Sequence, residues 1–560
     1  MKNNILEIND LTLAFKKDNR QNVLLNRLSF CVPVNKVTGI AGESGSGKSL
    51  TALSIMRLCP PGMKITSGSI SLNEYKSSDN LLSLSEKEMQ EVRGKKISMI
   101  FQEPMTSLNP SLKCGFQVAE ALKTHDTVSQ KIAYEKLIHL FREVRLPYPE
   151  RIARLYPHQL SGGQRQRVMI AMALIANPLL LIADEPTTAL DVTVQKKILE
   201  LLNEIICSHN LSILFITHDL RLLKAFAHHI IIMREGQIIE TGPSKDIFNS
   251  PAHPYTKGLI ACQPPLRHTP TRLLTIRDFE EGLTIPDNKK TGEKPSHQEI
   301  ILTIKNLSVF FFNRGSILIH RTEKINAVNT IDLEVFRGET VGIAGESGCG
   351  KTSLGKAILN LLPETYGNIY YKGVNIRGLK GNALRDYRKK VQVVFQDPYS
   401  SLNPLQTAGE IIAEPMKVHL RHLSPAERRD RCINLLEKVG IPADSADKYP
   451  HQFSGGQRQR IGIARSLALE PEMIILDEAV SALDVSVQAQ ILNLLNDLKM
   501  EFGLTYIFIS HDLSVVKYMS DRIIIMKDGK IEETGEAEEI FFHPHSEYTK
   551  LLIGSIPGSD

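Results

Sequence analysis

Two stretches of this 560-residue chain have the residue types and spacing of a phosphate-binding loop, or P-loop. They read GESGSGKS at 42–49 and GESGCGKT at 345–352. The glycines let backbone N–H groups turn toward phosphate oxygens, the lysine can reach the β- and γ-phosphates of a nucleotide, and the final hydroxyl can bind Mg²⁺. A glycine-rich turn before an ordinary helix would explain one match, but two matches predict two nucleotide sites. The loop residues are Gly42, Ser44, Gly45, Gly47, Lys48, Ser49, Gly345, Ser347, Gly348, Gly350, Lys351 and Thr352.

Two apolar runs end in paired acids, LLLIADE at 179–185 and MIILDE at 473–478. Such runs are typical of buried parallel strands, which deliver polar residues to the carboxyl edge of a sheet. There the first acid of each pair suits the coordination of Mg²⁺, and the second can accept a proton from an attacking water. A strand that ends in two solvated acids is the alternative, and the presence of the P-loops argues against it. The acids are Asp184, Glu185, Asp477 and Glu478.

A histidine and a glutamine also follow strand-like runs in each half of the chain. His218 and His511 come after ILFIT and YIFIS, from where an imidazole could reach a γ-phosphate. Gln102 and Gln396 end the runs ISMIFQ and VQVVFQ, where an amide could contact Mg²⁺ or the attacking water. A histidine that only forms hydrogen bonds in the core or at the surface could follow a strand in the same way, and so could an ordinary glutamine. For both pairs of residues the functional and the structural interpretations stay open.

The segment SGGQRQR occurs twice without a change, at 161–167 and 454–460. We call these the SGGQ segments. Serine suits a helix N-cap and glycine allows a ligand to approach closely, so each segment is predicted to begin an anion-binding helix. Each half already has a P-loop, and a second phosphate-binding element makes sense if it serves the nucleotide of another domain. A glycine-containing cap on a buried helix explains one copy but not the duplication. The residues are Ser161, Gly162, Gly163, Gln164, Ser454, Gly455, Gly456 and Gln457.

The elements that must position these residues form a tandem repeat. From the SGGQ segments onward the two copies are offset by 293 residues (454 − 161), and at the P-loop lysines by 303 (351 − 48). The first copy therefore carries extra residues, and we expect the polar stretch at 73–88 to be a surface loop. The predicted domains are residues 1–265 and 300–560, joined by a linker at 266–299 rich in Pro, Thr and charge.

Composition gives no indication of a membrane-spanning, exported or zinc-binding protein. The chain is 42% hydrophobic with a net charge of +5, which neither requires nor excludes nucleic acid. No apolar run approaches the roughly 20 residues of a membrane-spanning helix, and the N-terminal stretch MKNNILEIND has no apolar signal core. The seven cysteines include no C-x-x-C pair, which favours a reducing compartment without structural zinc.

As an ordered set, these motifs resemble the ATP-binding cassette (ABC) ATPases over nearly the whole chain, twice. The resemblance implies an α/β fold with two tandem P-loop NTPase domains, each with a mostly parallel core sheet, an N-terminal antiparallel β subdomain and a helical subdomain that carries the SGGQ segment. It implies the cofactors ATP and Mg²⁺. It also implies that the domains pair head to tail, so that each ATP lies between one P-loop and the SGGQ segment of the other domain.

The resemblance assigns a role to each residue. The first ATP would be shared by Lys48, Ser49, Gln102, Asp184, Glu185 and His218 with Ser454, Gly455, Gly456 and Gln457. The second would be shared by Lys351, Thr352, Gln396, Asp477, Glu478 and His511 with Ser161, Gly162, Gly163 and Gln164. The implied catalytic residues are Glu185, Glu478, His218 and His511, and the implied Mg²⁺ ligands are Ser49, Gln102, Asp184, Thr352, Gln396 and Asp477. Asp191 and Asp484 would cross the interface. Phe15 and Phe311 lie where the family stacks an aromatic ring on adenine.

Finer features are similar to the oligopeptide, dipeptide and nickel importers. These are FQDPYSSLNP at 395–404, YPHQFSGGQRQR at 449–460 and HPYTKGL at 253–259. The first half resembles the D-type ATPase of these systems and the second half the F-type, fused here in one chain. Two departures are that Ala479 replaces the proline kept at Pro186, and that the second tail reads HPHSEYTKLL rather than HPYT.

The resemblance implies a peripheral ATPase on the cytoplasmic face of a bacterial inner membrane. It would energise uptake of peptides, or of nickel, a metallophore or glutathione, through two separate integral-membrane permease subunits with an external solute-binding protein and no nucleic acid. A soluble twin-cassette translation factor acting on ribosomes is the alternative, but those proteins usually have a long charged helical linker, and they lack the HPYT-type tail. This linker region has prolines at Pro264, Pro265, Pro270, Pro286 and Pro295. A DNA-repair cassette ATPase would have zinc-binding cysteine pairs. Import is therefore the predicted function, with the cargo left open.

Overall fold

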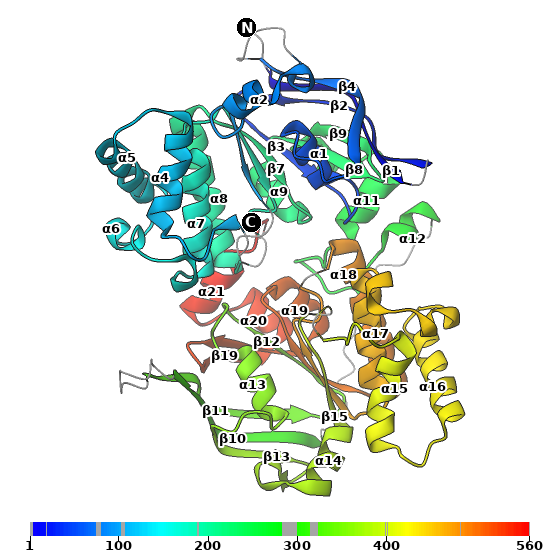
Figure 1. Cartoon of the computed structure of the whole chain (residues 1–560). Helices are drawn as coiled ribbons and strands as arrows, with labels where there is room; N and C mark the ends of the chain where they lie inside the picture. Colours follow the sequence, from blue (N-terminus) through cyan, green and yellow to red (C-terminus); the bar gives the residue numbers. More distant parts are fainter. Residues whose placement is uncertain are drawn as a thin grey trace. The chain divides into compact units, whose positions relative to one another are not determined.

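The computed structural model divides the chain into two compact units, Met1–Ile260 and Ala261–Ser559. The residues that it describes are 4–17, 20–73, 80–101, 107–187, 190–282, 299–313, 323–397, 399, 401–481 and 483–558. Each unit contains a six-stranded sheet, a smaller antiparallel sheet and a group of helices beside them (Figure 1).

The six-stranded sheet of the first unit has the order β5-β6-β7-β3-β8-β9, and its strands are parallel except at the β8–β9 pair. The strands are β5 (Ile97–Ile100), β6 (Leu180–Asp184), β7 (Ser212–Ile216), β3 (Val37–Ala41), β8 (His229–Arg234) and β9 (Gln237–Pro243). β3, β6 and β7 are buried at all five positions, as expected for parallel strands that are covered on both faces. Parallel strands end at the same edge, so the residues after β3, β6 and β7 are brought together.

The second unit repeats this sheet in the order β15-β16-β17-β12-β18-β19. Its strands are β15 (Val391–Val394), β16 (Met473–Asp477), β17 (Thr505–Ile509), β12 (Thr340–Ala344), β18 (Arg522–Lys527) and β19 (Lys530–Glu536). Only β18 and β19 pair in an antiparallel manner among the described strands of this sheet.

The antiparallel sheets and the helical groups complete the predicted architecture. The first sheet has the order β2-β1-β4 and the second β11-β10-β13-β14. Their strands are β1 (Asn4–Lys17), β2 (Arg20–Pro33), β4 (Met63–Leu72), β10 (Ile300–Asn313), β11 (Glu323–Phe336), β13 (Thr365–Tyr371) and β14 (Val374–Asn375). The helical groups are α4 (Cys114–His125), α5 (Gln130–Glu143) and α7 (Gly162–Leu174), then α15 (Ala408–His419), α16 (Pro425–Lys438) and α17 (Gly455–Leu467). The predicted fold class is confirmed in both units.

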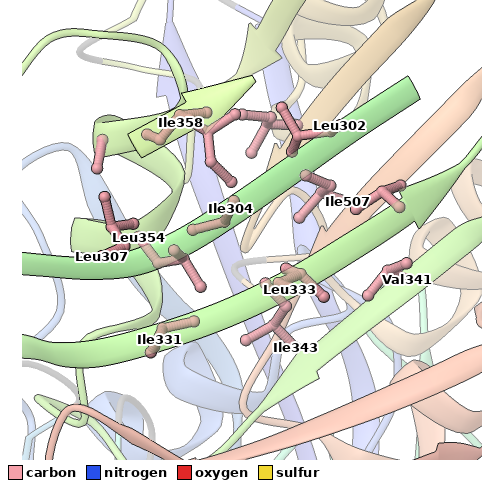
Figure 2. Packing of buried hydrophobic residues seen from close by; sticks show 14 of the residues in the cluster. Leu302, Ile304, Leu307, Ile331, Leu333, Val341, Ile343, Leu354, Ile358 and Ile507 are labelled. Atoms are coloured by element: carbon pink, nitrogen blue, oxygen red, sulfur yellow. The ribbon is translucent and has the colours of Figure 1, made fainter. Parts of the chain in front are cut away.

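The helix after each P-loop is held by the hydrophobic core. In the second unit Leu354 and Ile358 of α13 (Lys351–Ile358) lie in one buried cluster with residues of β10, β11, β12 and β17 (Figure 2). In the first unit Ala52 and Ile55 of α1 (Lys48–Ile55) lie in the equivalent cluster. Packing of this kind fixes the start of each helix, and therefore the loop before it.

One predicted surface loop is wrong in part. Within the stretch 73–88, Leu81 and Leu84 are buried in the core cluster of the first unit, and residues 74–79 lie outside the described residues. A short 3₁₀ helix, η1 (Leu81–Ser83), is followed by α2 (Glu86–Val92), whose first turn is closed by Ser85. The prediction rested on the mostly polar composition of this stretch, but its leucines Leu81 and Leu84 pack into the core.

Part of the predicted linker packs against the second unit. The Leu273 N–H donates to Asn493 Oδ1 at 3.0 Å, and Asn493 Nδ2 donates to the Leu273 carbonyl at 2.9 Å. Lys517 Nζ donates to the carbonyl of Leu266 at 2.6 Å. Leu273 is 1% exposed, and the helix α12 (Ile276–Glu280) follows it. Residues 266–282 are therefore ordered by buried leucine and isoleucine side chains within a polar composition, while residues 283–298 lie outside the described residues.

Replacement of Asn493 by alanine is expected to loosen this segment. The Leu273 N–H and carbonyl would both lose their hydrogen bonds to Asn493 in a buried site, at a cost of about 2 kcal/mol in the free energy of unfolding. We expect a lower melting temperature of the second unit, and faster tryptic cleavage after Arg272 and Arg277. The matched control is Asn496→Ala, which leaves both Leu273 contacts in place. Equal cleavage rates in the two variants would contradict this account.

Candidate functional site

Each P-loop passes so close to a neighbouring strand that its first residue must be glycine. Gly42 has φ +153°, and a Cβ built there would lie 2.1 Å from the carbonyl oxygen of Met233 at the end of β8. Gly345 repeats this arrangement, with φ +150° and 2.2 Å to the carbonyl oxygen of Met526. The loops are thus held between the end of one strand and the start of a packed helix.

The P-loop lysines are buried and bind the carbonyl oxygens of their own loops. Lys48 Nζ donates to the carbonyls of Gly42 and Glu43, both at 2.9 Å. Lys351 Nζ donates to the carbonyls of Gly345 and Glu346, at 2.7 and 2.9 Å. Each positive charge is therefore held inside its loop, where a phosphate group would bind.

A hydroxyl and a carboxylate meet beside each loop. Ser49 Oγ lies 3.1 Å from Asp184 Oδ1, and Thr352 Oγ1 lies 3.1 Å from Asp477 Oδ1. Burial raises the pKa of Asp184 to about 6 and also raises the pKa of Asp477. A divalent cation would offset this loss of hydration by stabilising the charged carboxylate. Hydroxyl and carboxylate oxygens are hard donors of the kind that Mg²⁺ takes, so the donor set fits Mg²⁺.

The glutamate after each aspartate contacts the histidine of the neighbouring strand. Glu185 Oε1 lies 3.1 Å from His218 Nδ1, and Glu478 Oε2 lies 3.5 Å from His511 Nδ1. In the second unit Gln396 Nε2 also donates to Glu478 Oε2 at 2.7 Å.

Gln102, the equivalent residue in the first unit, lies outside the described residues. Glu185 and Glu478 both have left-handed backbone conformations, with φ 49° and 48°. The φ angle of the glutamate is therefore the same whether proline (Pro186) or alanine (Ala479) follows it.

Glu478 and His511, the pair in the second unit, stabilise each other's charged forms. Burial acts to raise the pKa of Glu478, but the hydrogen bond with His511 and the positive charges of His511 and Lys351 lower it below its usual value. Burial likewise acts to lower the pKa of His511, yet Glu478 raises it. The carboxylate is consequently ionised at neutral pH, which is the state that a proton acceptor needs.

The SGGQ segments begin helices with the predicted serine caps. Ser161 Oγ accepts a hydrogen bond from the N–H of Gln164, and the Ser161 N–H donates to Gln164 Oε1 at 3.1 Å. Ser454 and Gln457 form the same pair at the start of α17. The glutamine of the segment thus completes a capping box, a role that the sequence analysis did not assign to it.

The two glycines of each SGGQ segment differ in the space around them. A Cβ on Gly163 would lie 2.9 Å from Val194 Cγ1, and one on Gly456 would lie 2.3 Å from Val487 Cγ1. These valines belong to the first turns of α8 (Val192–His209) and α18 (Val485–Phe502), which follow directly after Asp191 and Asp484. The first glycines have more room. A Cβ on Gly162 would lie 3.5 Å from its nearest neighbouring atom, and a Cβ on Gly455 would lie 3.8 Å from its own. Packing therefore explains the second glycine but not the first.

The structure gathers most of the predicted residues at one sheet edge in each unit. These are Lys48, Ser49, Asp184, Glu185 and His218, and then Lys351, Thr352, Gln396, Asp477, Glu478 and His511. Within its own unit each SGGQ segment instead belongs to the helical group. Phe15 lies on strand β1 and Phe311 on strand β10 of the two antiparallel sheets. Phe15 is half-buried and Phe311 is exposed.

A cavity of about 610 Å³ adjoins the site of the second unit. Its lining includes Thr352 and Asp477 together with the basic residues Lys356 and Arg465. Both basic residues lie outside the repeated motifs, because Leu53 and Met172 occupy the equivalent positions of the first copy (356 − 303 and 465 − 293). Among the described residues, no helix is both long and apolar enough to cross a bilayer.

Comparison with known families matches both units. The ABC transporter model matches residues 25–188 and 328–481. The model for the oligopeptide/dipeptide transporter C-terminal region matches residues 239–288 and 533–560. These two pairs of matches reproduce the repeat and its two tails.

Curated relatives align over the full repeat. The chain is 43% identical to the peptidoglycan transport ATP-binding protein YejF of Agrobacterium fabrum, over 98% of this chain and 96% of that protein. It is 42% identical to the glutathione import ATP-binding protein GsiA of Escherichia coli K12, over 99% of this chain and 90% of that protein. A solved dimeric ATP-binding cassette, MJ0796 bound to ADP and phosphate, is 33% identical over 42% of this chain and 98% of that chain, with a TM-score of 0.38. The chain therefore belongs to the ABC transporter family, as an import ATPase with two cassettes that each carry an oligopeptide/dipeptide-type C-terminal region.

Proposed function

We propose that both cassettes of this import ATPase hydrolyse ATP, and that the cargo is a peptide or a related small solute. The observation that carries the first part is the recurrence of one geometry in both units. The hydroxyl–aspartate distance is 3.1 Å in each, and a glutamate–histidine contact lies beside it. Neither cassette lacks the lysine, the proton acceptor or the histidine, so neither is a degenerate site.

The residues of each P-loop bind and orient the phosphates. Backbone N–H groups of the glycine-rich turn and the ammonium of Lys48 or Lys351 hold the β- and γ-phosphates. The hydroxyl and the aspartate, with Gln102 or Gln396, would hold Mg²⁺, which would neutralise charge on the phosphate oxygens.

The glutamate of each site takes the proton. Glu185 or Glu478 accepts a proton from the attacking water as the water oxygen bonds to the γ-phosphorus, while the bond from that phosphorus to the bridging oxygen breaks and ADP leaves. His218 or His511 orients that carboxylate and, in its protonated form, adds positive charge near the γ-phosphate.

The SGGQ segment of one cassette completes the ATP site of the other. Gly162 and Gly455 support this assignment, because among the described residues the nearest atoms to a Cβ at either position lie at ordinary van der Waals distance, 3.5 and 3.8 Å. A nucleotide that joins two cassettes closes them, and loss of the γ-phosphate lets them separate. In this arrangement Asp191 and Asp484 lie at the interface, and Phe15 and Phe311 stack on adenine.

We infer that this motion drives two separate permease subunits at the cytoplasmic face of a bacterial inner membrane. An external solute-binding protein delivers the cargo to them. Import ATPases of this family work with membrane permeases, and the described part of this chain contains no helix that could replace one. Relatives named for glutathione import and peptidoglycan transport support a peptide-related solute.

Removal of both proton acceptors should abolish turnover without abolishing ATP binding. We expect Glu185→Gln with Glu478→Gln to lower the ATPase rate at least ~100-fold, the typical contribution of general base catalysis. The control is Glu472→Gln. Glu472 directly precedes the first residue of β16, at the end of the strand away from Glu478, and forms an ion pair there with Lys372. A double variant that keeps more than about a tenth of the parental rate would contradict the assigned role.

The two glycines of the second SGGQ segment should respond differently to alanine. Gly456→Ala is expected to lower the free energy of unfolding by about 1–3 kcal/mol, because its Cβ overlaps Val487. Gly455→Ala is expected to keep the parental melting temperature but to lose ATPase activity several-fold, because the nucleotide of the other cassette approaches there. Thermal melts and steady-state ATPase assays measure the two effects. Parental activity in Gly455→Ala would exclude the proposed contact.

The partner proposal is tested by affinity purification of the tagged chain from detergent-solubilised membranes. Two polytopic permease subunits are expected to co-purify, and their genomic neighbours would indicate the cargo. Ribosomal proteins without a membrane partner would overturn the importer assignment and favour a translation factor.

A further inference from the structure

The tail of each cassette places a tyrosine hydroxyl against the P-loop of the same cassette. The Tyr255 hydroxyl, at the start of α11 (Pro254–Ala261), accepts a hydrogen bond from the N–H of Glu43 at 3.2 Å. The Tyr548 hydroxyl, in α21 (Glu547–Ile553), accepts one from the N–H of Glu346 at 3.3 Å. The two tyrosines are 293 residues apart (548 − 255), which is the offset of the repeat. The contact is therefore made independently in both copies.

The peptide group that each tyrosine holds is the one that holds the P-loop lysine. The N–H of Glu43 and the carbonyl of Gly42 belong to a single trans peptide, so they point in opposite directions. The carbonyl accepts from Lys48 Nζ at 2.9 Å while the N–H donates to Tyr255. Donation by the N–H polarises the amide and makes its carbonyl a better acceptor.

The second cassette has the same arrangement. The Gly345 carbonyl accepts from Lys351 Nζ at 2.7 Å, and the N–H of Glu346, in the same peptide, donates to Tyr548. Gly42 and Gly345 leave the torsions of this peptide free of Cβ restraint, so the contact with the tyrosine adds a restraint on its orientation.

The phenol rings are themselves held in place. Tyr255 is fully buried, and the Arg234 guanidinium lies over its ring at 4.8 Å from the centroid. Tyr548 is 9% exposed, and Lys527 Nζ lies over its ring at 4.7 Å. Burial raises the pKa of Tyr255 above its usual value, so this hydroxyl stays protonated at physiological pH.

A glutamate on the last strand of each sheet anchors the tail. The Glu240 carboxylate accepts from the N–H groups of Ala252 and His253, at 2.8 and 3.1 Å. Glu533 accepts in the same way from the N–H groups of His545 and Ser546, at 2.7 and 3.1 Å.

The residue two positions before each tyrosine caps the tail helix. His253 Nδ1 accepts from the N–H of Tyr255 at 3.1 Å, and Ser546 Oγ accepts from the N–H of Tyr548 at 3.2 Å. The second tail, SEYT rather than HPYT, therefore keeps the anchor, the cap and the tyrosine.

We propose that Tyr255 and Tyr548 are positioning residues for ATP binding, whose hydroxyls fix the P-loop peptide that holds the phosphate-binding lysine. The proposal gives the oligopeptide-type tail a role in nucleotide binding. It rests on the proposed assignment of the two P-loops as ATP sites.

The test is the full-length double variant Tyr255→Phe with Tyr548→Phe, which removes the two hydroxyls and keeps both rings. We expect the Kd for Mg-ATP, measured with a fluorescent ATP analogue, and the KM for ATP to rise about fivefold, the typical net effect of one neutral hydrogen bond. The kcat should change less than about twofold, because the groups that take part in chemistry are untouched.

The matched control is Tyr506→Phe. Tyr506 is also fully buried, and its hydroxyl donates to the Leu495 carbonyl at 3.0 Å. This variant should lose thermal stability and keep the parental KM. A parental KM in the double tyrosine variant, or an equal rise of KM in Tyr506→Phe, would overturn the proposal.

Two further variants keep the outcomes separable. Glu240→Gln with Glu533→Gln loosens the tail anchor while both phenols remain, and we expect it to raise the KM for ATP in the same direction; an unchanged KM would count against the proposal even if the phenylalanine variant does not fold. Lys48→Ala with Lys351→Ala tests the P-loop assignment itself. Parental ATP binding in the lysine variant would refute that assignment, whereas loss of binding there with no effect of the tyrosines would refute only the positioning role.

Discussion

The contact between a buried carboxylate and a P-loop hydroxyl is the constraint on which each cassette depends. Asp184 ends β6 and Ser49 lies in the first turn of α1, so their 3.1 Å contact joins the central sheet to the helix that carries the P-loop. Burial raises the pKa of this aspartate to about 6, so a cation that binds there gains the attraction of a poorly hydrated carboxylate. The same position at the sheet edge brings Glu185 beside His218. A strand that ended one residue earlier or later would separate these groups.

The tandem repeat preserves this arrangement and varies its surroundings. Thr352 replaces Ser49 and Ala479 replaces Pro186. The hydroxyl–aspartate distance is nevertheless 3.1 Å in both copies, and the φ angles of the two glutamates differ by only 1°. Lys356 and Arg465, which line the cavity beside the second site, are replaced by Leu53 and Met172 at the equivalent positions of the first copy. Conservation of the reactive geometry with divergence around it is consistent with two working ATP sites that face different surroundings.

Spacing and residue type predicted the parts of the site that follow strands or begin helices. The P-loops, the acids after buried strands and the serine caps of the SGGQ segments all lie within a few residues of the elements that position them. Contacts between distant segments were not predictable in this way. The Tyr255 hydroxyl meets the Glu43 N–H across 212 residues, and only the fold brings them together. The burial of Leu273 and Leu81 was likewise hidden, because polar neighbours dominate the composition of both stretches.

The central claim, that both cassettes are ATP sites, is tested most directly by the number of ATP molecules bound per chain. Full-length Glu185→Gln/Glu478→Gln would be equilibrated with Mg²⁺ and radiolabelled ATP, and bound ATP would be counted by equilibrium dialysis. The account predicts two ATP molecules per chain. Saturation at one ATP per chain would contradict it, because one of the two matching geometries would then fail to bind ATP.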